Sequence, residues 1–171
     1  MRKILLVGPP ESGKVSMAFR MARELGLLTE FERGELSAIH MVGGYELGLA
    51  DRPFRAPHHT VSSLALAGGR AMEQLRLSEV SLAHNGTLLL DGLTDFRRGA
   101  LEALANVMAK GVVQVGPRSR IPSRPKLLVA TACTTADQCA VEECAKILGI
   151  EEVVHCQPVT VMEMIGGKTG T

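Results

Sequence analysis

Aromatic residues are scarce in this sequence, and long apolar runs are absent from it. The 171 residues include no tryptophan, one tyrosine and four phenylalanines, so they offer no stacking platform for nucleic-acid bases. No apolar run approaches the roughly 20 residues of a membrane-spanning helix, so no membrane partner is expected. The run ILLVG near the N-terminus is too short for a signal peptide and leads directly into a glycine-rich loop. We therefore expect a cytoplasmic protein.

The sequence also has no large excess of positive or negative charge. The chain has 19 basic and 18 acidic residues, a net charge of +1, so no global field draws nucleic acid or an anionic membrane to it. What is present is 46% hydrophobic and 22% charged residues. This is the balance of an ordinary globular protein, and the length suits one domain with a sizeable core.

Cysteine is infrequent and is confined to the C-terminal quarter of the chain. The four cysteines are Cys133, Cys139, Cys144 and Cys156. They form no CxxC pair and match no zinc-binding spacing. Reduced, partly buried thiols are therefore the simpler interpretation in a cytosolic protein. A metal cluster that includes His155 remains an alternative, although the loose spacing speaks against it.

Short apolar runs alternate with amphipathic segments along the chain. Buried strands of a mainly parallel sheet are predicted at residues 3–8, 86–91, 126–132 and 151–157. Residues 111–122 alternate in polarity around a Gly-Pro turn, which predicts a hairpin.

Two amphipathic helices are predicted between these strands. Residues 13–26 repeat apolar side chains on one helical face, and Gly26 supplies a stop. Residues 97–111 repeat the pattern, with Leu101 and Leu104 directed inward. Strands that alternate with helices predict an α/β fold, a three-layer αβα domain around a mainly parallel sheet.

A glycine-rich loop, GPPESGKV, follows the first predicted strand and precedes the first predicted helix. A GxxxxGK pattern in this context binds nucleotide phosphates through inward-facing backbone N–H groups and the helix N-terminus. The lysine, Lys14, would reach the β and γ phosphates. The sequence therefore predicts an ATP or ADP site at Gly8, Pro9, Pro10, Ser12, Gly13, Lys14 and Val15.

Two positions of this loop disagree with a working nucleotide hydrolase. The motif normally ends in a Ser or Thr whose hydroxyl holds Mg²⁺, and Val15 has no oxygen to offer. Ser16 is turned by about 100° around the helix and is a poor substitute. Glu11 adds a carboxylate beside the phosphates, and like charges in a partly dry site are costly. Unless Glu11 points to solvent, nucleotide affinity should be low, and Mg²⁺ binding should be weakened.

A second candidate site segment is AHNGTLLLDGLTDF, residues 83–96. Its apolar run ends at Asp91, the position at which nucleotide-hydrolysing enzymes hold a magnesium ion. The following position, where such enzymes usually keep a second acid, is Gly92. The pattern therefore predicts a weak Mg²⁺ ligand at Asp91 without the acid that should accompany it.

Three segments resemble one protein family. RPFRAPHHTVSSLALAGG (52–69), SEVSLAHNGTLLLDGL (78–93) and ALEALANVMAKGVVQV (100–115) are similar to the magnesium-chelatase I-subunit-like AAA+ ATPases, most of all their competence-associated, ComM-like branch. The resemblance covers roughly residues 1–135. It implies an αβα P-loop NTPase (AAA+) core, a homo- or hetero-oligomeric ring with ATP at subunit interfaces and, in this branch, action on DNA.

The resemblance assigns family roles to single positions of this chain. The matching positions are Gly8, Gly13 and Lys14 of the phosphate loop and the magnesium-holding Asp91. The family's catalytic glutamate, which polarises the attacking water, falls at Gly92. Its sensor asparagine falls at Cys133, whose thiol is a weak donor. Asp95 is a conceivable substitute acid, but we expect it to begin the next helix and to point elsewhere.

The departures therefore gather on one site, and they are Glu11, Val15, Gly92 and Cys133. Loss of the water-orienting acid alone lowers hydrolysis by about 10²–10⁴-fold. We predict a nucleotide-binding core that hydrolyses ATP poorly or not at all, as a modulatory subunit or a remnant. Two alternatives stay open: a competent ATPase motor that acts on DNA in a mixed ring, and an interaction module without nucleotide.

Domain boundaries are expected at residues 1–156 for the ATP-binding core and 157–171 for a frayed C-terminal tail. The family's protease-like N-terminal domain and helical lid are expected to be absent from this chain, which would leave the nucleotide site more open to water.

Other candidate residues have structural alternatives. Adjacent His58 and His59 should point to opposite faces of an extended segment, which argues against a metal pair. His84 is expected to satisfy local backbone groups rather than to catalyse. Candidate arginine fingers or DNA contacts, which a solvated basic rim would also explain, are Arg97, Arg98, Arg118, Arg120 and Arg124.

Overall fold

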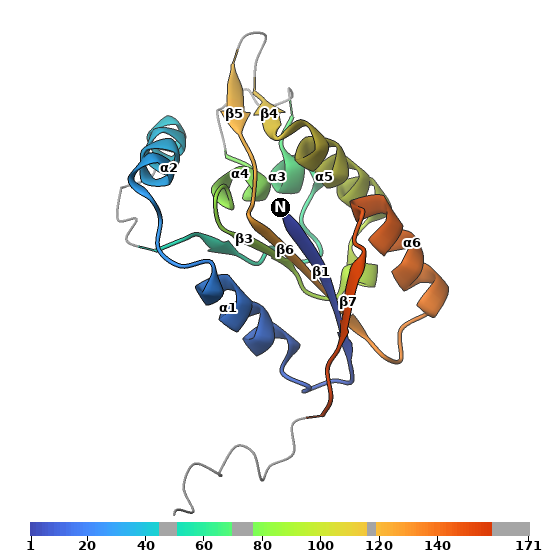
Figure 1. Ribbon diagram of the computed structural model, residues 1–171. Coiled ribbons are helices and arrows are strands. Elements are labelled where there is room, and N and C mark those ends of the chain that lie inside the picture. The colour runs from blue at the N-terminus through green and yellow to red at the C-terminus, as the bar shows by residue number, and fades with distance from the viewer. Residues whose placement is uncertain (45–50, 70–76, 116–118, 159–171) are drawn as a thin grey trace, which may run out of the picture.

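Five parallel strands form the central sheet of the protein (Figure 1). The computed structural model describes residues 1–44, 51–69, 77–115 and 119–158. Along the sheet the order is β2-β3-β6-β1-β7, so the first strand lies next to the sixth and the seventh. These strands are β1 (Arg2–Gly8), β2 (Phe54–Arg55), β3 (Thr87–Leu90), β6 (Leu127–Cys133) and β7 (Glu152–His155).

A separate antiparallel hairpin joins β4 (Val112–Gln114) to β5 (Arg120–Pro122). It confirms the hairpin that the alternating pattern predicts, while residues 116–118, including the predicted Gly-Pro turn and Arg118, lie outside the described residues.

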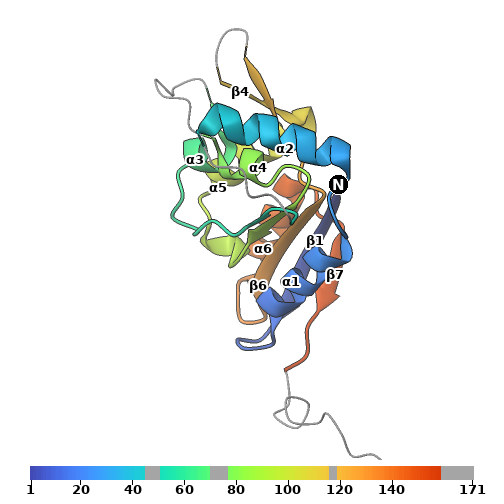
Figure 2. The same cartoon turned by 90° about the vertical axis from the view of Figure 1, so that its left-hand side faces the viewer.

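Helices cover both faces of the sheet (Figures 1 and 2). The two predicted helices are present as α1 (Lys14–Glu24) and α5 (Arg98–Lys110). The sequence patterns did not predict four further helices, which are α2 (Glu30–Gly43), α3 (Ser63–Ala67), α4 (Glu79–Leu82) and α6 (Gln138–Leu148). No helix within the described ranges is both long and apolar enough to cross a membrane.

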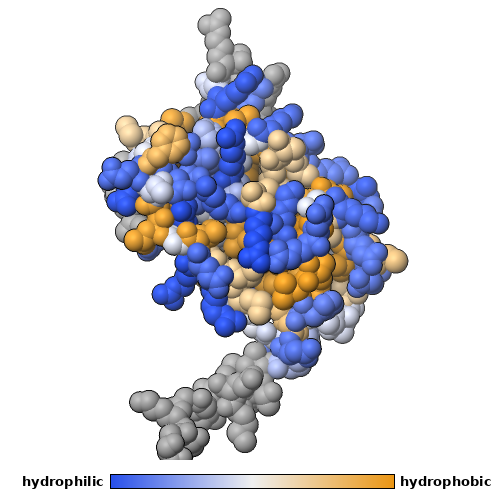
Figure 3. Space-filling model, in the orientation of Figure 1, coloured by the Kyte–Doolittle hydropathy of each residue, from blue (hydrophilic) through white to orange (hydrophobic). Residues whose placement is uncertain are grey.

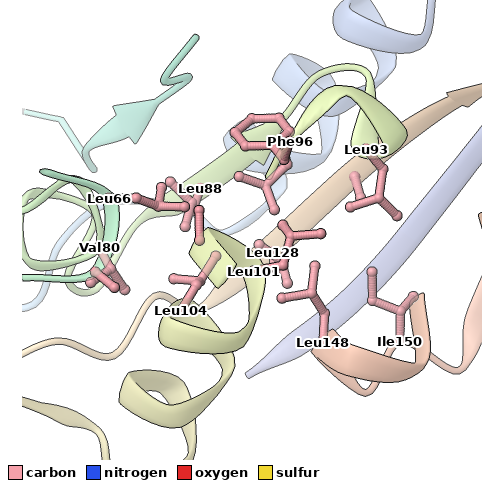
Figure 4. Close-up of a cluster of buried hydrophobic side chains, with 14 of the residues drawn as sticks. Leu66, Val80, Leu88, Leu93, Phe96, Leu101, Leu104, Leu128, Leu148 and Ile150 are labelled. Atoms are coloured by element: carbon pink, nitrogen blue, oxygen red, sulfur yellow. The ribbon is translucent and has the colours of Figure 1, made fainter. Parts of the chain in front are cut away.

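Alternation along the strands divides the core into two layers. Successive side chains of a strand point to opposite faces, so Leu88 and Leu128 pack toward α5 and α6, while Leu89 and Val129 pack toward α1. The larger cluster lies under α5 and α6 (Figure 4). This arrangement confirms the three-layer α/β fold with a mainly parallel sheet that the sequence predicts.

Helix α2 packs beside α4 and the hairpin (Figure 2). A capping box begins it: the Thr29 hydroxyl accepts the Glu32 N–H at 3.3 Å, and the Glu32 carboxylate accepts the Thr29 N–H at 3.0 Å. Ile39 then joins Leu82 and Ile121 in a small apolar cluster. Short local contacts therefore define where this helix begins, and tertiary packing holds it in place.

The surface is mainly hydrophilic on the face shown in Figure 3, with apolar areas in the region of β7. A groove there is lined by Leu5, Val141, Ile150 and Val153, and the Val153 side chain is 48% exposed. Because β7 pairs only with β1 in the described sheet, its other edge is left without a neighbouring strand.

Candidate functional site

Strand order brings three loops together at one edge of the sheet. Strand β6 lies between β1 and β3, and all three run parallel, so their carboxyl ends meet at the same edge. The register pairs Gly8 with Cys133 across β1 and β6, and Asp91 follows the last residue of β3. The carboxyl edge of a parallel sheet, where the chain order reverses, is the usual ligand site of such folds.

These loops surround an open cavity of about 550 Å³. The phosphate loop, the end of β3, the end of β6 and the segment before α3 each supply part of its wall. The lining residues are Pro10, Lys14, Val15, Ala56, Pro57, His58, His59, Leu89, Asp91, Gly92, Asp95, Thr131 and Cys133. The cavity therefore brings together the predicted Lys14, Val15, Asp91, Gly92 and Cys133, and it contains side chains that the sequence patterns had not grouped with them.

The phosphate loop is held closed by its own lysine. The Lys14 ammonium donates to the carbonyl oxygens of Gly8 at 2.9 Å and Pro9 at 2.7 Å. A side chain at Gly8 would crowd the Ser12 hydroxyl at 2.6 Å and the Cys156 carbonyl at 2.8 Å, so the loop requires glycine there. The Lys14 ammonium is thus bound to the loop's own carbonyls, and Lys14 forms part of the cavity wall.

Glu11 has a left-handed backbone, with φ of 63°, followed at Gly13 by φ of 71°. Alternating left-handed residues in such a loop turn successive N–H groups toward an anion. The Glu11 side chain is exposed and does not line the cavity. The expected repulsion between the Glu11 carboxylate and phosphate is therefore weakened. The backbone strain of a non-glycine residue in the left-handed region remains.

Val15 lies in the cavity wall at the start of α1 and is 38% exposed. Its isopropyl group stands where the motif usually presents a hydroxyl to Mg²⁺. Ser16 is exposed and is not part of the cavity wall. The first turn of α1 therefore presents an apolar surface to the cavity at this position.

Asp91 is held in place by a buried threonine that the sequence patterns did not identify. Thr131 is 1% exposed, and its hydroxyl donates to Asp91 Oδ1 at 2.6 Å while accepting the Gly92 N–H at 2.9 Å. One carboxylate oxygen of Asp91 is thus oriented by the neighbouring strand. The only signal in the sequence was a polar residue inside the apolar run LLVATAC of β6.

Cys133 closes the wall beside the phosphate loop. Its Sγ lies 3.0 Å from the Thr135 hydroxyl. Hydrogen bonds from the Thr135 side chain and backbone lower the pKa of the Cys133 thiol, and the nearby Lys14 charge acts in the same direction. A thiol at this position is a weaker hydrogen-bond donor than the asparagine of the resembling family.

Asp95 corrects one sequence-based expectation. It does not begin the next helix and point elsewhere: it ends the short 3₁₀ helix η1 (Leu93–Asp95), and it lines the cavity with Asp91 and Lys14. Gly92 has φ of 72°, and a Cβ built on it would collide with Asp95 Oδ2. The tight turn after β3, which the sequence pattern did not resolve, brings this carboxylate back to the site.

The histidine pair corrects a second sequence-based expectation. His58 and His59 were expected on opposite faces, yet their rings contact each other, with centroids 4.0 Å apart and planes tilted by 36°. Both line the cavity, in a segment that has left β2 at Arg55 and turns at His59. His59 also meets Phe96 edge-on at 6.5 Å. No group of three or more metal-ligand side chains occurs within the described parts of the chain.

The SLAHNG segment lies away from this cavity and ties other elements together. His84 Nδ1 accepts the Arg124 N–H at 3.0 Å, so the ring satisfies a backbone group, but one 40 residues away and not a local one. The Asn85 amide donates to Glu35 of α2 at 2.9 Å. Burial lowers the pKa of His84, which is 2% exposed. The His84 ring, whose Nε2 lies 3.4 Å from the Glu35 carboxylate, therefore links α2 to the chain that enters β6.

The RPFR segment has a similar linking role. Arg52 donates to the Glu32 carboxylate at 2.9 Å and to the Asn85 carbonyl at 2.7 Å. Arg55 forms two hydrogen bonds with Glu79, at 2.8 and 3.0 Å. Arg52 and Arg55 therefore stabilise the connections around the sheet, whereas the later residues of the same string, from Ala56 to His59, line the cavity.

Among the remaining candidates, Arg98 is engaged on the surface of α5, where it pairs with Glu102 at 2.8 Å and with Glu143 of α6. Its ion pairs support the interpretation of a solvated rim at that position. All four cysteines are free thiols: Cys156 is buried, Cys133 and Cys144 are half-buried and Cys139 is exposed.

Comparisons with known proteins place the chain in one family. The family model described as magnesium chelatase, subunit ChlI, matches residues 1–162. Competence protein ComM of Haemophilus influenzae is 35% identical over 133 residues, 74% of this chain and 26% of that protein. The uncharacterized protein YifB of Escherichia coli is 38% identical over 133 residues, with the same two coverages. The chain thus spans about a quarter of the length of these curated relatives.

Solved structures show the same fold at lower identity. NtrX from Brucella abortus in complex with ADP has a TM-score of 0.60 and 17% identity, over 91% of this chain and 32% of that chain. The complex of the same protein with ATP has a TM-score of 0.54 and 20% identity, over 91% of this chain and 33% of that chain. At these identities the likeness establishes the arrangement of helices and strands.

Proposed function

Because this chain belongs to the magnesium chelatase ChlI family of AAA+ nucleotide-binding domains, we propose that it binds ATP and ADP and hydrolyses ATP weakly or not at all. One observation carries the proposal: the GPPESGKV loop places Lys14 in the wall of the same cavity as Asp91, at the carboxyl edge of the sheet. Nucleotide phosphates would meet the loop N–H groups, the start of α1 and the lysine charge there. The complexes of NtrX with ADP and ATP support this choice of ligand.

Weak hydrolysis follows from what the cavity wall contains. Val15 offers no hydroxyl to a magnesium ion, and Gly92 offers no side chain to orient an attacking water. Cys133 stands beside the phosphate loop with a thiol that is occupied by Thr135. These three substitutions leave the binding groups in place and remove those that act on the bond to the γ phosphate.

Magnesium fits the site only as a weakly held ion. Mg²⁺ typically takes one or two carboxylates, phosphate oxygens and several waters. Asp91 supplies one carboxylate, whose Oδ1 already accepts the Thr131 hydroxyl at 2.6 Å. The bound ion would neutralise charge between the β and γ phosphates. We therefore propose that nucleotide binding depends little on Mg²⁺ in this chain.

Calorimetric titration with ADP and ATP, with and without Mg²⁺, tests the proposal. Lys14→Ala should abolish binding, while Lys110→Ala, an exposed lysine at the end of α5, should leave it unchanged. The absence of binding to the unmodified protein at millimolar nucleotide would instead favour an interaction module. Hydrolysis at about 1 s⁻¹ or faster, the range of ordinary enzymes, would overturn the weak-hydrolysis part and favour a competent ATPase.

We propose that this core acts within a ring that it forms with other AAA+ subunits. The alternative of a motor on DNA is tested by adding an intact relative to this chain. Turnover in the mixture that exceeds the sum of the separate proteins, and that is lost with Lys14→Ala in this chain, would support a mixed ring. Turnover equal to that sum would support the modulatory or remnant role.

A further inference from the structure

The position that lacks a catalytic side chain is filled by a carboxylate from three residues further along. Gly92 adopts the left-handed region, and the Asp95 N–H donates to the Gly92 carbonyl at 2.9 Å, which closes the turn. In this turn Asp95 Oδ2 occupies the space that a Cβ of residue 92 would take. The Asp95 carboxylate therefore lies where the first side-chain atom of a larger residue at position 92 would be.

Buried neighbours on both sides fix this placement. Leu93 is fully buried and Phe96 is 4% exposed, and both belong to the core between the sheet and α5 (Figure 4). Phe96 also contacts the His59 ring across the cavity wall. These two buried side chains lie on either side of Asp95 and fix the course of the backbone through the turn.

The Asp95 carboxylate is not used by the fold in the described parts of the chain. It accepts no hydrogen bond there, and α5, which begins at Arg98 after the N-cap residue Arg97, has no side-chain cap. The side chain is exposed to the cavity that also contains Lys14 and Asp91. A carboxylate in the cavity wall that accepts no hydrogen bond in the described parts of the chain is available to accept one from water.

We propose that Asp95 supplies the carboxylate that orients the attacking water in the residual ATP hydrolysis of this chain. The proposal rests on the proposed function, since it requires ATP in the cavity. The water oxygen forms a bond to the γ phosphorus, and the bond from that phosphorus to the bridging oxygen breaks with its electron pair left on ADP. One proton of the water passes to the Asp95 carboxylate and then to solvent, and the products are ADP and phosphate.

The geometry also explains why this hydrolysis should be slow. An aspartate is one methylene shorter than the glutamate of the resembling family, and Asp95 belongs to a position three residues further along the chain. Its negative charge repels the γ phosphate in the ground state, because both are anionic and share one cavity. The substitution Asp95→Asn should therefore tighten ATP binding while slowing the chemical step.

Three measurements on the full chain separate these effects. Calorimetry gives the affinity for ADP, trapping of ADP with aluminium fluoride and Mg²⁺ reports the transition-state geometry, and single-turnover assays give the hydrolysis rate. For Asp95→Asn we expect unchanged ADP affinity, with trapping and hydrolysis each reduced by about 10²-fold. Asp95→Glu should retain both within about tenfold, a loss of about 1.4 kcal/mol. The matched control is Asp51→Asn, an exposed aspartate outside this cavity.

The possible results distinguish this proposal from the proposed function. Unchanged trapping and hydrolysis in Asp95→Asn would overturn the role of Asp95 and leave nucleotide binding intact. ADP binding without any trapping or hydrolysis in the unmodified protein would also overturn it, and would support a purely binding core. Failure of the unmodified protein to bind ADP would overturn the proposed function, and this inference with it.

Discussion

At the scale of single residues, the site consists of a few groups whose neighbours decide what they do. The Thr131 hydroxyl connects the Gly92 N–H to the Asp91 carboxylate, so one side chain orients both the backbone turn and the acid. Lys14 is held by two loop carbonyls at the cavity wall. Small changes at such residues should therefore alter stability and ligand binding in separable ways.

Thr131→Val should destabilise the protein by about 1–3 kcal/mol, because it leaves the Gly92 N–H without its partner. The volume is nearly unchanged, so little of the loss comes from packing. Urea unfolding measures the effect, and Thr134→Val at an exposed position of the same segment is the control. Equal stability of the Thr131 variant would show that another group satisfies this turn.

Glu11→Gly should stabilise the protein by about 1 kcal/mol, because Glu11 holds φ of 63° and glycine adopts this region without a Cβ penalty. Glu11→Gln, which removes only the charge, should leave stability and ADP affinity nearly unchanged, since the side chain does not line the cavity. Thermal unfolding and calorimetry compare the two variants. A large rise in ADP affinity with Glu11→Gln would mean that the charge reaches the phosphates.

Val15→Thr should make nucleotide binding depend on magnesium. The variant replaces one methyl group in the cavity wall by a hydroxyl at the position that holds Mg²⁺ in related loops. We expect Mg²⁺ to raise ATP affinity by about tenfold, or about 1.4 kcal/mol, in this variant and much less in the unmodified protein. Val15→Ser tests the hydroxyl without the methyl group, and Val15→Ala serves as the control that lacks both.

At the scale of elements, the attachment of α2 depends on a charged cluster. Glu32 accepts hydrogen bonds from Arg52 and from the Thr29 N–H, and Lys126 lies 3.1 Å away. The Arg52 hydrogen bond, followed by that from the Thr29 N–H, lowers the pKa of Glu32 from 4.5 to about 2. The helix is therefore joined to the RPFR segment by an interaction that requires the ionised carboxylate.

Acid should weaken this attachment in a defined range. Because the folded pKa of Glu32 is lowered, its stabilisation is complete above about pH 4.5 and is lost as the pH falls toward about 2. Glu32→Gln should remove about 1–3 kcal/mol at neutral pH and flatten the pH dependence in that range. Urea unfolding at several pH values measures both. If the free energy of unfolding of the variant falls with pH as steeply as that of the unmodified protein, a group other than Glu32 causes the acid sensitivity.

At the scale of the whole molecule, binding at the carboxyl edge should stabilise the entire sheet. Three neighbouring strands, β1, β3 and β6, end at the cavity. A ligand at ten times its Kd stabilises the folded state by about 1.4 kcal/mol. For a domain of this size that corresponds to a rise of about 3–6 °C in Tm. ADP should produce this rise in the unmodified protein and in Lys110→Ala, and none in Lys14→Ala.

The sequence by itself determined the parts of the protein that depend on local patterns. Apolar runs and helical periodicity predicted four strands of the parallel sheet, both amphipathic helices and the hairpin, and the fold class is confirmed. The string of residues from Gly8 to Val15 predicted a phosphate loop because its strand–loop–helix context is contiguous in the chain. Helix α2 was missed although its capping box, Thr29 with Glu32, is also local.

Only the tertiary structure decided which distant side chains meet. Thr131 reaches Asp91 because β6 lies beside β3, a neighbour relation set by the order of strands and not by their sequence spacing. Asp95 returns to Gly92 because Leu93 and Phe96 are drawn into the core and a left-handed glycine tightens the turn between strand and helix. Chain pattern fixes the local elements; packing and backbone geometry fix the contacts between them.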